Sequence, residues 1–186
     1  MVSASIVGRV VKELAGEGFR FTIIGGTVVE LALGSRDLGD DVDVYAEEPD
    51  VLVEEEKYRE VAERRGWVLG QTWLGTPMIL VRVGDVEVPV EFYDNMFDFY
   101  VPPSMVERAR RASVGGARAK VVRLEDHIVL KANAGREKDI ERLREIASLA
   151  SKGKLHLNLK AIKEAASEFD DEPVILRRLR DAGFRV

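Results

Sequence analysis

Two carboxylates that alternate with valines are the residues of this chain whose types and spacing point most directly to chemistry. Asp41 and Asp43 alternate with Val42 and Val44. Residues two apart in a strand point to the same face of a sheet, so we expect the aspartates to project together while the valines anchor the other side. Carboxylates grouped at a strand end suit a hard cation such as Mg²⁺, which takes oxygen ligands and keeps substrate phosphates as further partners. The pair therefore predicts a metal site.

A diglycine lies upstream of this pair, directly after an apolar run. The run from Phe21 to Ile24 predicts a buried strand, and Gly25 and Gly26 interrupt it before a compact apolar helix expected from Thr27 to Leu33. Glycine lets a backbone approach a ligand closely, and the free N–H groups at a helix N-terminus favour anions. The strand, the diglycine and the helix together predict a phosphate-binding turn.

The composition limits the classes of protein to which these sites can belong. The chain has 186 residues, of which 46% are hydrophobic and 33% charged, with a net charge of −5. No apolar run approaches the ~18 residues that cross a membrane, and the absence of cysteine excludes disulfides and thiolate metal sites. The negative charge argues against broad nucleic-acid binding. We expect a cytoplasmic protein without membrane contact, with a charge-rich composition common in thermophile proteins.

Periodicity predicts the remaining elements. A hairpin is expected from strands 77–83 and 86–93, joined at Gly84-Asp85. Further strands are expected at 67–71 and 119–123, and helices at 3–16, 50–65, 158–168 and 173–182. Residues 124–150 predict two helices broken near Gly135, and residues 105–112 a short helix that carries Arg108, Arg110 and Arg111. The expected organisation is a catalytic domain over 1–123 and a helical segment over 124–186.

The order of these features resembles the nucleotidyltransferase superfamily to which DNA polymerase beta belongs. Its signature is a hydrophobic residue, Gly-Gly or Gly-Ser, a short helix, and Asp-hydrophobic-Asp on the next strand; here Ile24-Gly25-Gly26 is followed by Asp41-Val42-Asp43-Val44. The resemblance covers about residues 19–148. It implies an α/β (α+β) fold: a mixed, twisted sheet with helices on one face, followed by a C-terminal helical segment that completes the cleft.

The resemblance also implies a metal-dependent enzyme with three acidic ligands. The superfamily carries a third carboxylate on a later strand, and Glu91 between two hydrophobic residues matches that position, with Asp94 as the fallback. In this interpretation Asp41 and Asp43 hold two Mg²⁺ ions, for which Mn²⁺ is an alternative, and Glu91 supports the ion next to the acceptor. Two ions in such a site stabilise both the entering and the leaving oxygens when a nucleoside monophosphate moves from a triphosphate to a hydroxyl.

Five residues are implied in nucleotide binding: Gly25, Gly26, Thr27, Arg36 and Lys131. The first three would cradle the β- and γ-phosphates, and Arg36 would add positive charge. Two interpretations of Lys131 stay open, because its ammonium can snorkel to solvent or reach the triphosphate. The segment that follows resembles the C-terminal helices of a branch of small stand-alone proteins that includes abortive-infection type toxins. In that branch a lysine and an Arg-x-Lys-Asp segment, here Arg136, Lys138 and Asp139, face the cleft.

The acceptor is the least determined part of the prediction. Basic residues at 108–111 and 177–180 favour a macromolecular acceptor such as a tRNA or a protein, and the toxin branch implies an antitoxin-like partner. A transferase acting on a small molecule is the first alternative. A nucleotide-binding module of the same fold without catalysis is the second, although three intact carboxylates favour an enzyme.

Overall fold

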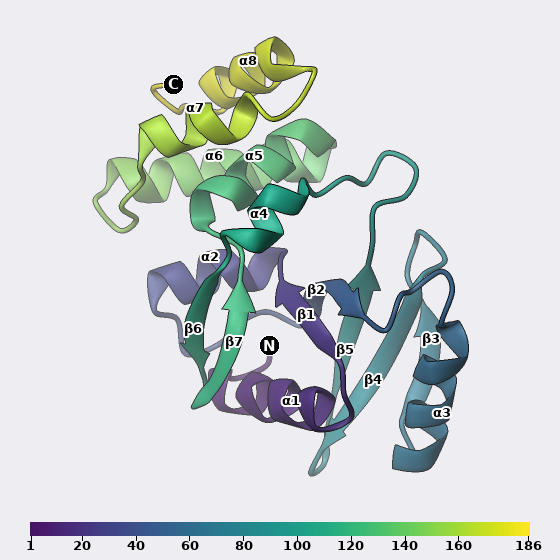
Figure 1. Ribbon diagram of the computed structural model, residues 1–186. Helices are drawn as coiled ribbons and strands as arrows, with labels where there is room; N and C mark the ends of the chain where they lie inside the picture. Colours follow the sequence, from purple (N-terminus) through teal and green to yellow (C-terminus); the bar gives the residue numbers. More distant parts are fainter. The chain divides into compact units, whose positions relative to one another are not determined.

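The computed structural model describes residues 1–186 (Figure 1), and these residues form two compact units. The first unit comprises Met1–Asp94 and Ala109–Val121, and the second comprises Asn95–Arg108 and Val122–Val186. The chain was expected to divide once, at residue 123. The contacts instead place the division after Val121 and assign the segment 95–108 to the helical unit.

The first unit is built on a mixed seven-stranded sheet with the order β3-β4-β5-β2-β1-β7-β6. Its elements are α1 (Ala4–Gly16), β1 (Arg20–Ile23), α2 (Gly26–Leu33), β2 (Val42–Glu48), α3 (Glu55–Arg65), β3 (Val68–Gln71), β4 (Pro77–Val83), β5 (Val86–Tyr93), β6 (Arg110–Val114) and β7 (Ala117–Val121). β2 pairs with β5 and β1 with β7 in parallel, and the other pairs are antiparallel. The α/β fold with a mixed sheet that the sequence predicted is confirmed.

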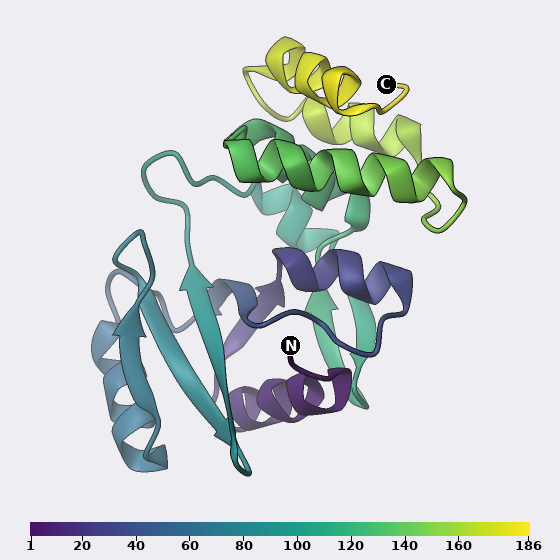
Figure 2. The ribbon, with the colours of Figure 1, turned by 180° about the vertical axis from the view of Figure 1, so that it is seen from behind.

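One face of the sheet forms the core of this unit. The buried residues of the neighbouring strands β4, β5 and β2 alternate with half-buried or exposed ones, as expected for a sheet that packs helices on one side. They are Val42, Val44 and Ala46 on β2, Ile79, Val81 and Val83 on β4, and Val88, Val90 and Phe92 on β5. α1 contacts β4 and β7, and α3 contacts β3 and β4 (Figure 2). Burial of these residues leaves the alternate residues of β2 and β5 on the other face.

The second unit is a group of helices held together by apolar contacts and buried ion pairs. Its elements are α4 (Pro103–Glu107), α5 (Leu124–Ala134), α6 (Glu137–Ser151), α7 (Leu159–Ala166) and α8 (Glu172–Ala182). Asp126 is fully buried and pairs with Arg108 and Arg123. On α8, Arg178 donates hydrogen bonds to the carbonyl oxygens of Ala132 and Asn133 in the last turn of α5, each over 2.9 Å. None of the helices in the structure is long and apolar enough to cross a membrane.

His127 on α5 is the one buried side chain with an unsatisfied polar atom. It is 1% exposed, and its Nε2 atom has no hydrogen-bond partner. Burial lowers the pKa of His127 to about 3, and the positive charges of Lys131 and Arg142 act in the same direction. The imidazole is therefore neutral in the folded protein at physiological pH.

The prediction of a helix over 105–112 is wrong. α4 ends at Glu107, and Arg110 and Arg111 lie on β6, which pairs with β7 through a turn at Gly115 and Gly116. Both glycines have positive φ, as a two-residue hairpin turn requires. The predicted hairpin of β4 and β5 and the helix break at Gly135 are confirmed.

Candidate active site

Asp43 and Glu91 lie side by side on the face of the sheet opposite the core. β2 and β5 run parallel, and their register pairs Asp43 with Glu91 directly. Paired residues of neighbouring strands are about 4.8 Å apart and point to the same face. Both side chains are half-buried, whereas Val42, Val44, Val90 and Phe92 on the other face are buried. The structure therefore brings together two of the three predicted metal ligands.

The diglycine turn packs against the first of these carboxylates. Gly25 has φ of 70° and ψ of −158°, and a Cβ atom built on it would lie 1.9 Å from Oδ2 of Asp43. The backbone N–H of Ile24 donates to the carbonyl oxygen of Asp43 over 2.9 Å. Gly25 is thus the residue that needs to be glycine, both for its backbone conformation and for its contact with Asp43.

Gly26 has a different role from Gly25. It is exposed, it begins α2 with negative φ, and a Cβ atom on it would meet nothing within 4 Å. The first N–H groups of a helix have no intrahelical partner and point toward anions. The exposed start of α2 therefore lies directly beside Asp43, joined to it through Gly25.

Tyr93 and Trp73 extend the site beyond the predicted residues. The Tyr93 hydroxyl donates a hydrogen bond to Oε2 of Glu91. Burial raises the pKa of Tyr93, and this hydrogen bond and the charges of Asp43 and Glu91 raise it further, so the phenol stays protonated. The Trp73 side chain makes a second hydrogen bond to Tyr93 and lowers its pKa in part. Tyr93 was detectable from the sequence, since it lies two residues after Glu91 and shares its face of the strand.

The other predicted residues of the first unit lie around this centre. Asp41 is exposed and precedes the first residue of β2. Arg36 is exposed in the loop after α2, where its carbonyl oxygen accepts a hydrogen bond from the N–H of Ala4. Thr27 is 2% exposed, and its hydroxyl donates to the carbonyl oxygen of Leu38 over 3.3 Å. For Thr27 the backbone N–H, rather than this hydroxyl, is the group better placed to meet a phosphate.

Lys131 belongs to the helical unit, where it is part of an ion-pair cluster. Its Nζ atom lies 2.8 Å from Oδ1 of Asp139, which is fully buried and also paired with Arg136. Burial alone would raise the pKa of Asp139, but the hydrogen bonds from Arg136 and Lys131 outweigh it and the pKa is lowered. The cluster thus has a structural function in this unit. A contact of Lys131 with nucleotide stays a prediction.

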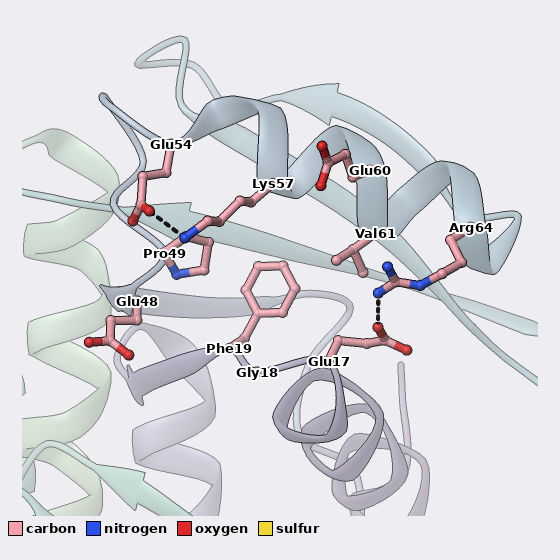
Figure 3. Close-up of a pocket in the computed structure, with 10 residues that line it drawn as sticks. All are labelled: Glu17, Gly18, Phe19, Glu48, Pro49, Glu54, Lys57, Glu60, Val61 and Arg64. Atoms are coloured by element: carbon pink, nitrogen blue, oxygen red, sulfur yellow. Dashed lines mark hydrogen bonds and ion pairs between the residues drawn. The ribbon is translucent and has the colours of Figure 1, made fainter.

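Figure 3 shows a separate pocket of the first unit, and neither Asp43 nor Glu91 is among the residues that line it. Phe19, Pro49 and Val61 are its apolar lining, and charged side chains surround them. Glu48, which also lines it, is five residues after Asp43, which corresponds to about 16 Å along an extended strand. Four of its charged residues form ion pairs within the pocket, Arg64 with Glu17 and Lys57 with Glu54. We therefore place the candidate active site at the other end of β2, at Asp43, rather than at this pocket.

The donor set of the site fits a divalent cation shared with a substrate. Two carboxylates side by side repel each other unless a cation or a proton lies between them. No group of three or more His, Asp and Glu side chains in the structure is arranged to hold a metal ion by itself. A Mg²⁺ ion at Asp43 and Glu91 would need phosphate oxygens and water as its other ligands, as is common for Mg²⁺. The participation of Asp41 stays a prediction.

The fold and this arrangement define a nucleotidyltransferase-like protein, and comparison with known proteins assigns the family. Residues 3–181 match the family described as "Nucleotidyl transferase of unknown function (DUF2204)", and the chain belongs to it. The resemblance to the nucleotidyltransferase superfamily is confirmed. No match to a curated protein sequence is found.

Two solved structures have the same fold. One is an antigenic nucleotidyltransferase-like protein from Paracoccidioides brasiliensis, with a TM-score of 0.52, 14% identity, and coverage of 97% of this chain and 88% of that one. The other is the antibiotic-resistance factor ANT(2'')-Ia, with a TM-score of 0.55, 14% identity, and coverage of 96% of both chains. At this level of identity the similarity concerns the fold alone.

Proposed function

We propose that this protein is a metal-dependent nucleotidyltransferase that moves a nucleoside monophosphate from a nucleoside triphosphate to an acceptor hydroxyl. The observation that carries the proposal is the pairing of Asp43 with Glu91 on one face of the sheet, with Gly25 packed against Asp43. The family and the fold support nucleotidyl transfer as the reaction class. The requirement for Mg²⁺ is inferred from the donor set.

The reaction exchanges one phosphoester bond for another. The acceptor oxygen forms a bond to the α-phosphorus, the bond from that phosphorus to the bridging oxygen of pyrophosphate breaks, and the acceptor proton leaves to a base. Bound Mg²⁺ would supply charge stabilisation to the entering and leaving oxygens. Asp43 and Glu91 orient the reacting groups, and Glu91 is the proposed base. The N–H groups at the start of α2 bind the leaving pyrophosphate, with Arg36 as the proposed additional cation.

A macromolecular acceptor has less support in the structure than in the sequence. It depended on basic residues at 108–111 and 177–180. Arg108 is paired with the buried Asp126 and with Glu168, and Arg178 binds the carbonyl oxygens at the end of α5. These two arginines act inside the helical unit. A tRNA or protein acceptor and an antitoxin-like partner therefore have less support from these segments, and a small-molecule acceptor remains the first alternative.

Radioactive labelling tests the proposal. The protein is incubated with each α-labelled nucleoside triphosphate, Mg²⁺ and a cell extract, and labelled products are separated into RNA, protein and small-molecule fractions. We expect labelling that Asp43→Asn and Asp41→Asn abolish while their melting temperatures stay close to that of the wild type. Glu87→Gln, which changes an exposed carboxylate of the same strand as Glu91, is the matched control and should label normally. Labelling by Asp43→Asn at the wild-type rate contradicts the proposal. Triphosphate binding without any labelled product indicates a non-catalytic module.

A further inference from the structure

We infer that Trp73 is a binding platform for the acceptor, and that the acceptor presents an uncharged ring next to its reacting hydroxyl. This inference rests on the proposed function, because Trp73 can bind the acceptor only if the transfer takes place at Asp43 and Glu91. It adds a specificity-determining residue and a substrate class to that site.

Trp73 is exposed but held in place. It lies in the loop between β3 and β4 and is 61% exposed, whereas the only other tryptophan, Trp67, is 8% exposed. The loop that carries Trp73 adjoins the site, because Met78 at the start of β4 pairs with Glu91, and the indole interacts with Tyr93. The loop is closed by bonds between Thr72 and Thr76, namely N–H to carbonyl oxygen at 2.8 Å and hydroxyl to hydroxyl at 2.7 Å. A large aromatic ring held open to solvent in this way is suited to bind a ligand.

The geometry of the reaction places the acceptor on this side of the site. An in-line displacement at phosphorus has the entering and leaving oxygens on opposite sides. The sheet order runs from β1, which leads into Gly25 and the start of α2, through β2 and β5 to β4 and β3. If pyrophosphate leaves toward the start of α2, the acceptor enters from the side of β5 and β4. Trp73 lies on that side, because its loop leads into β4, whose residue Met78 pairs with Glu91 of β5.

The charge of this region excludes a phosphate backbone as the expected occupant. Charged residues are 33% of the chain, yet no Asp, Glu, Lys or Arg occurs between Arg65 and Arg82. Neither β3, nor the loop that carries Trp73, nor residues 77–81 of β4 therefore provide a lysine or arginine, and Arg82 near the far end of β4 is paired with Glu87. Binding of RNA through its backbone requires such residues. An uncharged ring, such as a sugar or an aromatic ring, can instead pack on the indole, as rings do on exposed aromatic side chains.

Tryptophan fluorescence tests this inference through ligand binding alone, without measuring catalysis. In Trp67→Phe, Trp73 is the only indole, and the variant is titrated with methyl glucopyranoside, benzyl alcohol, glycerol and a single-stranded oligoribonucleotide. We expect a saturable change with at least one ring-bearing probe and none with glycerol or the oligonucleotide. The two ring-bearing probes distinguish a sugar from an aromatic ring. No response to either ring, or a stronger response to the oligonucleotide, overturns the inference.

Labelling of the acceptor is the second test of this inference. We expect Trp73→Ala to reduce acceptor labelling by at least about tenfold, the scale of one lost stacking contact, and Trp73→Phe to retain most of it. Calorimetry with a non-hydrolysable triphosphate and Mg²⁺ should give both variants wild-type affinity. Equal losses of labelling and triphosphate affinity in Trp73→Ala would assign the indole to the nucleotide and overturn the inference. Wild-type labelling by Asp43→Asn contradicts the proposed function instead, so the two failures are distinguishable.

Discussion

Alanine substitutions at Gly25 and Gly26 separate the structural glycine from the ligand-binding one. Gly25 occupies a backbone region that is nearly restricted to glycine, and its Cβ atom would overlap the Asp43 carboxylate at 1.9 Å. Strain in such a region and overpacking against a neighbour each cost about 1–3 kcal/mol. We therefore expect Gly25→Ala to lower the free energy of unfolding by about 3 kcal/mol, which corresponds to a decrease in melting temperature of about 6–12 °C.

Gly26→Ala is the matched control for stability and the probe for binding. Its backbone is helical and a methyl group meets nothing within 4 Å, so alanine should leave stability unchanged or raise it by up to about 1 kcal/mol. A side chain there would obstruct a phosphate that approaches the helix start. We expect triphosphate affinity to fall by about tenfold or more, which is about 1.4 kcal/mol or more.

Thermal unfolding and calorimetry with Mg²⁺ and a non-hydrolysable triphosphate measure both effects in the same samples. Gly25→Ala should lose stability and binding together, because the displaced carboxylate is the proposed ligand, whereas Gly26→Ala should lose binding alone. Wild-type melting and affinity in Gly25→Ala would refute the contact between the turn and Asp43. Normal binding in Gly26→Ala would refute a phosphate site at the start of α2.

Two further predictions concern the helical unit. His127 has a pKa of about 3 when folded and 6.5 as the ordinary value, so the folded state binds fewer protons between these values and stability is lost as the pH falls below 6.5. His127→Leu should reduce the loss of unfolding free energy between pH 7 and pH 5 by about 2 kcal/mol, and equal pH dependence in urea titrations would argue against a neutral buried imidazole. Arg178→Ala should lose about 1.5–3 kcal/mol because two carbonyl hydrogen bonds to a charged group disappear. The exposed Arg177→Ala is its control, and similar unfolding midpoints for both variants would contradict the assigned role.

Local patterns were sufficient for much of the fold and for the identity of the candidate carboxylates. The hairpin of β4 and β5 followed from alternation around Gly84, and the faces of Asp43 and Glu91 followed from the two-residue period of a strand. The missed strand β6 was also encoded locally, in the two glycines at 115–116, but the arginines before them favoured a helix. Pairing with β7 overrode that local preference.

The sequence by itself determined which residues can do the chemistry, whereas the tertiary structure decided which of them meet. Asp43 and Glu91 become neighbours because burial of the valines fixes the register of β2 against β5, and pairing between distant strands is not visible in a local period. The same holds for the hydrogen bonds that connect Trp73 and Tyr93 to Glu91. Arg108 and Arg178 appeared available to a partner in the sequence, but packing of the helical unit commits them to buried groups. Long-range packing, rather than residue type, determined their roles.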